Sequence, residues 1–299
     1  MILQTIKQIS CLLCLCCFLQ QSAFSQDDKD KPAYTLFDNT GKQISYGELI
    51  KRLSGYDVIF LGELHNCPIT HWLEFEITRS IYNIHKDQLM LGAEMFESDN
   101  QLIFDEYMQQ NISYDRFEAE ARLWDNYRTD YYPVVFFAKE HHIPFIATNI
   151  PRRYANIVKN KGFEALDSLS EEAKRYIAPL PIDFEYDEAQ SAAAFSMMNM
   201  MGGRRAGDNR KLAQAQAIKD ATMGWFIARN IKNKFLHING SYHSNRQGGI
   251  IPYLLRYRPN TSIVTVTSVR QEYIRKLDDD HKGLADFYIC VPEDMVNSY

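Results

Sequence analysis

The sequence DVIFLGELH, residues Asp57 to His65, is the stretch that determines the fold. Its apolar residues are continuous rather than alternating, which is typical of a strand buried on both faces of a parallel sheet. Pro68 suits the first turn of a helix that follows directly. Isoleucine and leucine then recur every three or four residues up to Ile84, so one face of this helix is expected to pack on the sheet. The opposite face carries His71, Glu74, Thr78 and Tyr82.

Five further segments have the same apolar character and are separated from one another by helical stretches. They are Gln88–Ala93, Ile143–Ala147, Phe235–Ile238, Ser262–Thr267 and Asp286–Val291. Alternation of strands and helices predicts an α/β fold, in which a mainly parallel sheet lies between two layers of helices. We therefore expect a three-layer α/β/α architecture.

One connection is far longer than such a fold requires. About 85 residues separate Asn149 from the strand at Phe235, whereas a crossover between parallel strands needs only a dozen or more. Helical patterns fill this connection, including a run from about Asp208 to Asn230. We expect residues 26–299 to form one α/β domain with a helical insertion at about residues 151–232.

The first 25 residues differ in composition from the rest of the chain. Lys7 is their only charge, a short apolar run follows from Cys11 to Leu19, and Ala23-Phe24-Ser25 precedes the charged stretch. These are the marks of a secretory signal peptide at residues 1–25, with an apolar run too short to span a bilayer. The sequence thus predicts export to the periplasm or cell envelope. A lipid anchor is not favoured, because Leu13, Leu15 and Cys16 stand directly before Cys14, Cys16 and Cys17, where a lipoprotein would place a small residue.

The charge composition bears on nucleic-acid partners, and the cysteine count bears on disulfide bonding. The chain has 33 basic and 38 acidic residues and no basic run, so no nucleic acid is expected as a partner. After removal of the signal peptide only Cys67 and Cys290 remain. They form either one disulfide or two small buried side chains, and we favour the second.

Polar side chains follow four of the predicted strands at the point where each strand ends. Glu63 and His65 follow the first, Glu94 the second, Asn149 the third and His243 the fourth. Ligands of parallel α/β proteins bind at the carboxyl ends of the strands. The first and fourth ends share the pattern Gly-x-x-His, in which the glycine permits a sharp turn and close approach of a ligand. The four ends together predict a functional site.

Two imidazoles and two carboxylates suit two kinds of chemistry. His65, Glu94 and His243 are the donors that a divalent transition metal prefers, with Glu63 as a further candidate. The same groups can perform acid–base catalysis without a metal. Alternatively, the histidines cap loops and the glutamates pair with Arg152 or Arg153. His71, in the first turn of its helix, either reaches the site or is solvated.

The segments that follow these strands resemble a known family. VIFLGELHNCPITHWL, GAEMF, IPFIATNIPR, DATMGWF and HINGSYHSNRQGGIIPYL, at residues 58–73, 92–96, 143–152, 220–226 and 237–254, are similar to the ChaN family of iron-regulated, haem-binding proteins in the Tiki superfamily. The resemblance covers nearly all of the mature chain. It implies the α/β fold with a smaller helical part, as in erythromycin esterase-like proteins, and a role in haem or iron uptake at the cell envelope.

The resemblance also implies ligands and partners. Haem coordination in the family involves tyrosine, and the candidates for haem binding are Tyr127, Tyr131, Tyr132, Tyr242 and Arg152. Envelope transport components and a second copy of the chain are the implied protein partners. Kinship with metal-dependent hydrolases implies roles for His65, Glu94, His243 and Glu63. Two hypotheses follow: an exported haem-binding protein, or a metal-dependent peptidase or esterase that uses the paired Gly-x-x-His motifs.

Overall fold

The computed structural model describes residues 31–186 and 209–299, of which Tyr34 onward form one compact unit. The predicted signal peptide at residues 1–25 and part of the predicted insertion, residues 187–208, lie outside the described residues. Within the described residues, no helix is both long and apolar enough to cross a bilayer.

The core is a seven-stranded sheet in the order β1-β7-β6-β2-β5-β3-β4. Every neighbouring pair is parallel except β1 with β7. The strands are β1 (Thr35–Asp38), β2 (Val58–Glu63), β3 (Leu89–Glu97), β4 (Phe145–Asn149), β5 (Lys234–Gly240), β6 (Ile263–Gln271) and β7 (Phe287–Pro292). All six predicted strands are confirmed. The edge strand β1 was not predicted from the sequence.

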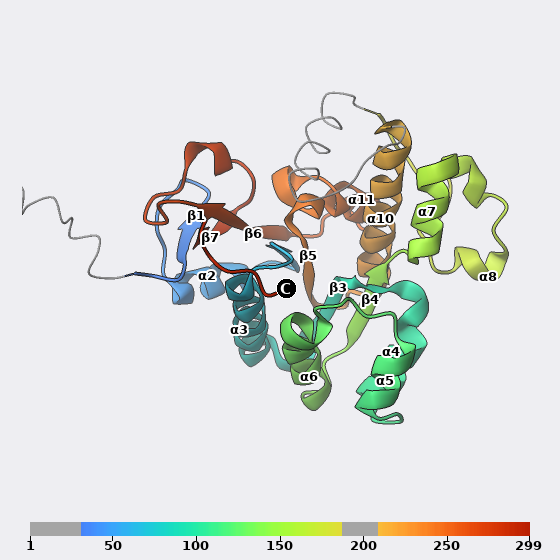
Figure 1. Ribbon diagram of the computed structural model, residues 1–299, viewed down its shortest axis with the longest axis horizontal. Coiled ribbons are helices and arrows are strands. Elements are labelled where there is room, and N and C mark those ends of the chain that lie inside the picture. The colour runs from blue at the N-terminus through green and yellow to red at the C-terminus, as the bar shows by residue number, and fades with distance from the viewer. Residues whose placement is uncertain (1–30, 187–208) are drawn as a thin grey trace, which may run out of the picture. The chain divides into compact units, whose positions relative to one another are not determined.

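Helices cover both faces of this sheet, so the predicted three-layer α/β/α fold is confirmed (Figure 1). In β2, Val58 and Phe60 face α10 (Asn209–Asn230) and α11 (Ile250–Tyr257). The alternate residues, Ile59 and Leu61, face the larger core formed with α3 (Pro68–His85) and α6 (Tyr132–Glu140). Because each strand residue contacts one helical layer or the other, the strand is apolar throughout.

The remaining helices are short and connect the strands. They are α2 (Tyr46–Leu53), α4 (Gln101–Met108), α5 (Tyr114–Glu120), α7 (Arg152–Lys161) and α8 (Glu171–Lys174), with a π-helical turn η4 at Tyr127–Tyr131. In the long connection between β4 and β5, α7 and the start of α10 enclose a small apolar cluster of their own, which includes Tyr154, Val158 and Ile218. The second half of α10 packs on the sheet.

The polar face predicted for α3 is wrong. His71, Glu74 and Thr78 are buried, whereas Ile84, predicted to face the sheet, is 52% exposed. The physical reason is that α3 packs against η4 and α6 as well as against the sheet, and the ring of His71 contacts that of Tyr131 edge-on at 5.2 Å. Cys67 and Cys290 are free and buried, in agreement with the interpretation favoured above.

Candidate functional site

Four predicted site residues, Glu63, His65, Glu94 and His243, lie together at the carboxyl edge of the sheet. Glu63, the last residue of β2, is in register with Gly240, the last residue of β5. On the other side of β5, Glu94 lies inside β3, next to an irregularity of pairing between Ala93 and Glu97. His243 follows in a 3-10 turn directly after Gly240. The ends of β2, β3 and β5 therefore bring two carboxylates and two imidazoles to one place, as the sequence predicted.

Glu94 and His243 form a buried pair that is extended by Asp220 of α10. His243 Nε2 lies 3.2 Å from Glu94 Oε1, and His243 Nδ1 lies 2.5 Å from Asp220 Oδ1. The other oxygen of Glu94 accepts the backbone N–H of Gly240 at 2.8 Å. Burial opposes charge on His243, but the two carboxylates outweigh it and raise its pKa to about 10. Burial likewise opposes charge on Glu94, yet His243 and His65 hold its pKa well below the usual range.

His65 is held from its other side by Glu63. His65 Nδ1 lies 2.6 Å from Glu63 Oε1, and the same oxygen accepts the hydroxyl of Tyr131 at 2.7 Å. Burial lowers the pKa of His65, but the hydrogen bond and charge of Glu63 more than compensate and raise it. The His65 ring lies against Gly240, because a Cβ at that position would come within 2.7 Å of His65 Nε2 and 3.4 Å of Glu94 Oε2. Only glycine permits this approach.

Each histidine of this group thus has a carboxylate on Nδ1, and His243 presents Nε2 to Glu94. A carboxylate that accepts Nδ1–H leaves Nε2 as the ligand atom once a metal displaces its proton, which is the usual orientation of a metal-binding histidine. In residue type, His65, Glu94 and His243 are donors that a divalent transition metal prefers. The three residues, together with Glu63 and Asp220, are called the Glu94 cluster below.

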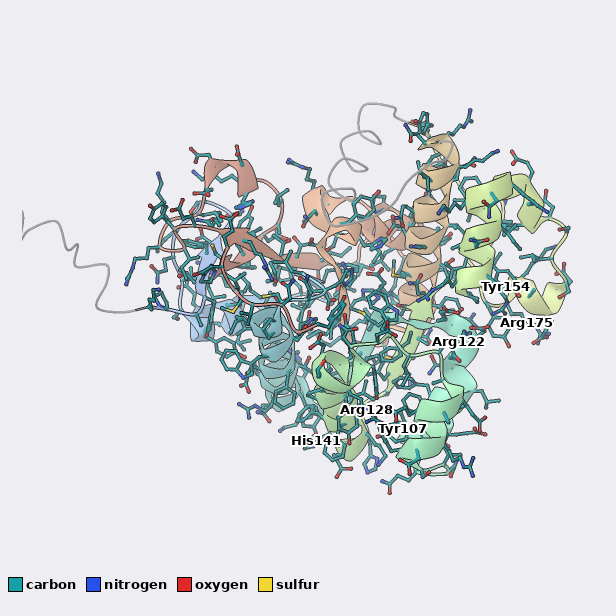
Figure 2. All side chains as sticks on the ribbon, in the orientation of Figure 1. Tyr107, Arg122, Arg128, His141, Tyr154 and Arg175 are labelled. Atoms are coloured by element: carbon teal, nitrogen blue, oxygen red, sulfur yellow. The ribbon has the colours of Figure 1, made fainter. Side chains whose placement is uncertain are left out.

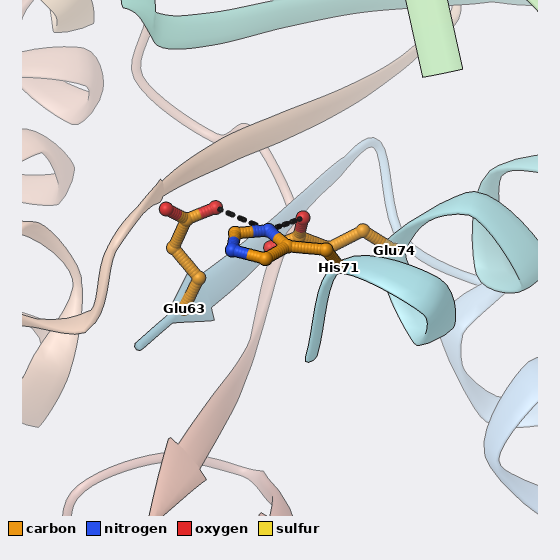
Figure 3. A group of neighbouring side chains, drawn as sticks. All are labelled: Glu63, His71 and Glu74. Carbon is orange, nitrogen blue, oxygen red and sulfur yellow. Dashed lines mark hydrogen bonds and ion pairs between the residues drawn. The ribbon is translucent and has the colours of Figure 1, made fainter. Parts of the chain in front are cut away.

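A second group lies beside the Glu94 cluster and was missed by the sequence analysis. His71 and Glu74 of α3 face Glu63, and all three residues are buried. Figure 3 shows the imidazole of His71 between the two glutamates. The spacing of a histidine and a glutamate three residues apart on one helix was the available signal. The apolar stripe of α3 predicts a polar opposite face, which leaves open whether His71 reaches the site and does not single out Glu74.

The predicted tyrosines differ in accessibility. Tyr127 is buried among aromatic rings that include Phe96 and Phe117, and Tyr131 is buried with its hydroxyl on Glu63. Tyr132 is half-buried beside Tyr127. Tyr242 is 37% exposed, and its ring lies 5.2 Å from that of His243. Tyr242 is therefore the accessible tyrosine of the four, adjacent to the Glu94 cluster.

The arginines after β4 do not neutralise the site glutamates. The side chain of Arg152 is 78% exposed and lies 3.9 Å from Glu97, not from Glu63 or Glu94. Arg153 binds Asp99 at 2.5 Å. Arg122, marked in Figure 2, pairs with Glu97 and Asp99 as well. The alternative of arginine pairing for Glu63 and Glu94 is therefore wrong.

Comparison with known proteins assigns the chain to a family. Residues 49–254, more than half of the chain, match the family model described as haem-binding uptake, Tiki superfamily, ChaN. The chain belongs to the ChaN family. No curated protein sequence matches it.

The fold is similar to that of a solved ChaN structure, and weaker similarity extends to other solved structures. ChaN of Campylobacter jejuni, whose structure is described as showing cofacial haem binding, is 19% identical, with a TM-score of 0.66 over 88% of this chain and 96% of that one. An erythromycin esterase mutant in its open conformation is 11% identical, with a TM-score of 0.49 over 87% of this chain and 95% of that one. The type III effector HopBA1 is 13% identical, with a TM-score of 0.44 over 82% and 90%.

Proposed function

We propose that this ChaN-family protein binds haem and serves haem or iron uptake at the cell envelope. The observation that carries the proposal is the family match over residues 49–254. The fold shared with Campylobacter jejuni ChaN, described with cofacial haem, supports it. Export through the leader at residues 1–25, envelope transport components and pairing of two copies around haem belong to the same proposal.

Tyr242 is the residue that we propose as the haem ligand. Tyrosine is an established axial ligand of haem iron. Among the predicted tyrosines, Tyr127 and Tyr131 have buried hydroxyl groups, whereas Tyr242 is accessible at the edge of the sheet. Trp124, which packs edge-on against His65 at 5.1 Å, adds an aromatic surface to the same region.

A haemin titration tests this proposal. The wild-type chain should give a Soret shift that saturates at a defined stoichiometry, and Tyr242→Phe should weaken binding at least tenfold. Tyr56→Phe is the matched control, because Tyr56 is also 37% exposed but precedes β2 at the amino edge of the sheet. A titration that does not saturate contradicts haem binding. Equal affinity of Tyr242→Phe and wild type contradicts only the assignment of the ligand.

The geometry of the Glu94 cluster favours a second candidate function, that of a metal-dependent hydrolase of peptide or ester bonds. Glu63 and Asp220 orient His65 and His243, and Gly240 N–H orients Glu94. His65, Glu94 and His243 would hold a divalent ion. When bound, the ion would activate a water molecule. The partial exposure of His65, 29% for its side chain, gives the cluster access to solvent.

Metal analysis tests the hydrolase. Protein purified without chelator should contain a transition metal whose removal abolishes hydrolysis of a peptide or ester substrate, and Glu94→Gln should do the same. Glu97→Gln is the matched control, because Glu97 is a buried glutamate of the same strand that binds Arg122 instead of histidine. Hydrolysis that survives both chelation and Glu94→Gln would exclude this function.

A further inference from the structure

A second group of histidine and carboxylate side chains lies on the α3 side of Glu63. His71 and Glu74 belong to the first two turns of α3, and Glu63 ends β2. The exposed fractions are 4% for His71, 1% for Glu74 and 2% for Glu63. Figure 3 shows the carboxylates on either side of one ring nitrogen. The proposed haem-binding function uses neither His71 nor Glu74.

Both nitrogens of His71 face hydrogen-bond acceptors. Nε2 lies 3.1 Å from the carbonyl oxygen of His65 and 3.4 Å from Asp130 Oδ2, so it carries a hydrogen. Nδ1 lies 3.0 Å from Glu74 Oε2 and 3.7 Å from Glu63 Oε2. A neutral imidazole has only one N–H, so with Nε2 protonated its Nδ1 is a lone pair that points at carboxylate oxygens. The contact requires either a proton, carried by His71 Nδ1 or by one of the two carboxyl groups, or a metal ion between these atoms.

Two carboxylate oxygens in this group have no hydrogen-bond donor. Glu63 Oε2 and Glu74 Oε1 are buried and unpartnered. The neighbouring donors are directed elsewhere: Tyr131 donates to Glu63 Oε1, and Asn126 donates to Asp130 and to the carbonyl of His65. Buried polar atoms are almost always satisfied, and an unpaired buried carboxylate oxygen is costly. Both oxygens belong to the carboxylates that face His71 Nδ1.

The distances between the three inward-facing atoms suit a small metal ion. His71 Nδ1, Glu63 Oε2 and Glu74 Oε2 all lie within 4.8 Å of one another. Ligands about 2.1 Å from a tetrahedral ion are about 3.4 Å apart, and the two distances from His71 Nδ1 bracket that value. We propose that Glu63, His71 and Glu74 form a buried binding site for a divalent transition-metal ion, distinct from the ligand set of His65, Glu94 and His243.

The surroundings of the three residues match those of a metal site. One imidazole and two carboxylates suit zinc, manganese or iron, and the second oxygen of Glu74 is available as a further ligand. The carbonyl oxygen of His65 fixes His71 with Nε2 protonated, as the hydrogen-bond partner of a metal-binding histidine does. Asp130 is in turn held by Asn126 and Ser298 at 2.7 Å each. An ion of charge +2 would balance Glu63 and Glu74 in a region with little access to water.

Zinc titration of the full chain, without a polyhistidine tag and after chelator treatment, tests the site. Wild-type protein should bind zinc calorimetrically, and Glu74→Gln and His71→Gln should each lose one equivalent or bind it at least tenfold more weakly. Glu76→Gln, two residues along α3 and paired with Arg79 at the surface, should bind like wild type. Glu94→Gln should retain the equivalent that Glu74→Gln loses, which separates this site from the Glu94 cluster.

X-ray absorption of wild-type protein loaded with one equivalent of zinc keeps the test decisive if the variants do not fold. The expected spectrum has one imidazole and oxygen ligands, from His71 and the two glutamates. Two imidazoles would place the ion at His65 and His243 and would overturn the proposal. Absence of zinc binding by the wild type, or equal binding by wild type, Glu74→Gln and His71→Gln, would also overturn it, because a second proton on His71 would then suffice.

Discussion

The two histidine clusters on either side of Glu63 consist of the same residue types but differ in their exposure to solvent. In the Glu94 cluster, His65 is partly exposed and Gly240 brings backbone against the imidazole. In the group around His71, every side chain is buried and two carboxylate oxygens lack donors. A partly exposed imidazole suits exchange with a substrate, whereas a fully buried group suits a permanently held cation.

The largest expected effect concerns the two aspartates that support these clusters. Asp220→Ala removes the acceptor of His243 Nδ1–H and leaves a charged donor buried, which should reduce the free energy of unfolding by about 3 kcal/mol. Asp130→Ala should cost only about 1 kcal/mol, because His71 Nε2 keeps the carbonyl oxygen of His65. Urea denaturation measures both. An equal loss of unfolding free energy in Asp220→Ala and Asp130→Ala would contradict the proposed difference between the two clusters.

A smaller effect is expected where backbone approaches His65. In Gly240→Ala the new Cβ would lie 2.7 Å from His65 Nε2, and displacement of the ring should cost about 2 kcal/mol. Gly47→Ala is the control, because nothing lies within 4 Å of a Cβ there and α2 should gain about 0.5–1 kcal/mol. Thermal unfolding of both variants measures the two opposite shifts. A neutral Gly240→Ala would show that the glycine is not required.

A pH-dependent effect distinguishes His237, an imidazole inside β5, from the charged imidazoles of the two clusters. His237 is fully buried and its ring nitrogens contact the neutral groups of Thr148 and Asn239. Burial lowers its pKa to about 4, against about 6.5 in the unfolded chain. The unfolded state therefore binds one more proton between these values, and this site's contribution to stability, complete above pH 6.5, declines by about 1.4 kcal/mol per pH unit as the pH falls.

His237→Gln should remove this dependence, which unfolding experiments at pH 7 and pH 5 would show as a smaller difference than in the wild type. Surface-exposed His141 offers the matched variant His141→Gln, which should keep the wild-type difference. Equal differences in His237→Gln and wild type would mean that folding does not lower the pKa of His237.

The sheet was predictable because its strands are continuous apolar runs, and the Glu94 cluster because it follows the ends of those strands. Strand β1 was missed, since it is only four residues long and pairs at the edge, antiparallel to β7. The sequence placed Glu94 after its strand, but β3 continues to Glu97 across an irregularity of pairing that no local pattern indicates.

Contacts between distant segments were the part that could not be predicted. The polar residues of α3 are buried because η4, some 55 residues later, covers them with Tyr131 and Asp130. Asp220 was noted in neither the metal set nor the haem set, although it lies 2.5 Å from His243. The periodicity of apolar residues indicates which face of a helix packs on the sheet. It does not indicate that a second, polar face is buried as well.

Glu63 gives one oxygen to each cluster, and this has a thermodynamic consequence. Oε1 holds His65, while Oε2 faces His71 across 3.7 Å. A positive charge gained beside His65 or beside His71 acts on the same carboxylate. The free energy of binding at one of the two groups therefore depends on whether the other is occupied. Such coupling is reciprocal: whatever factor a cation beside His71 imposes on the affinity at His65, binding at His65 imposes on the cation.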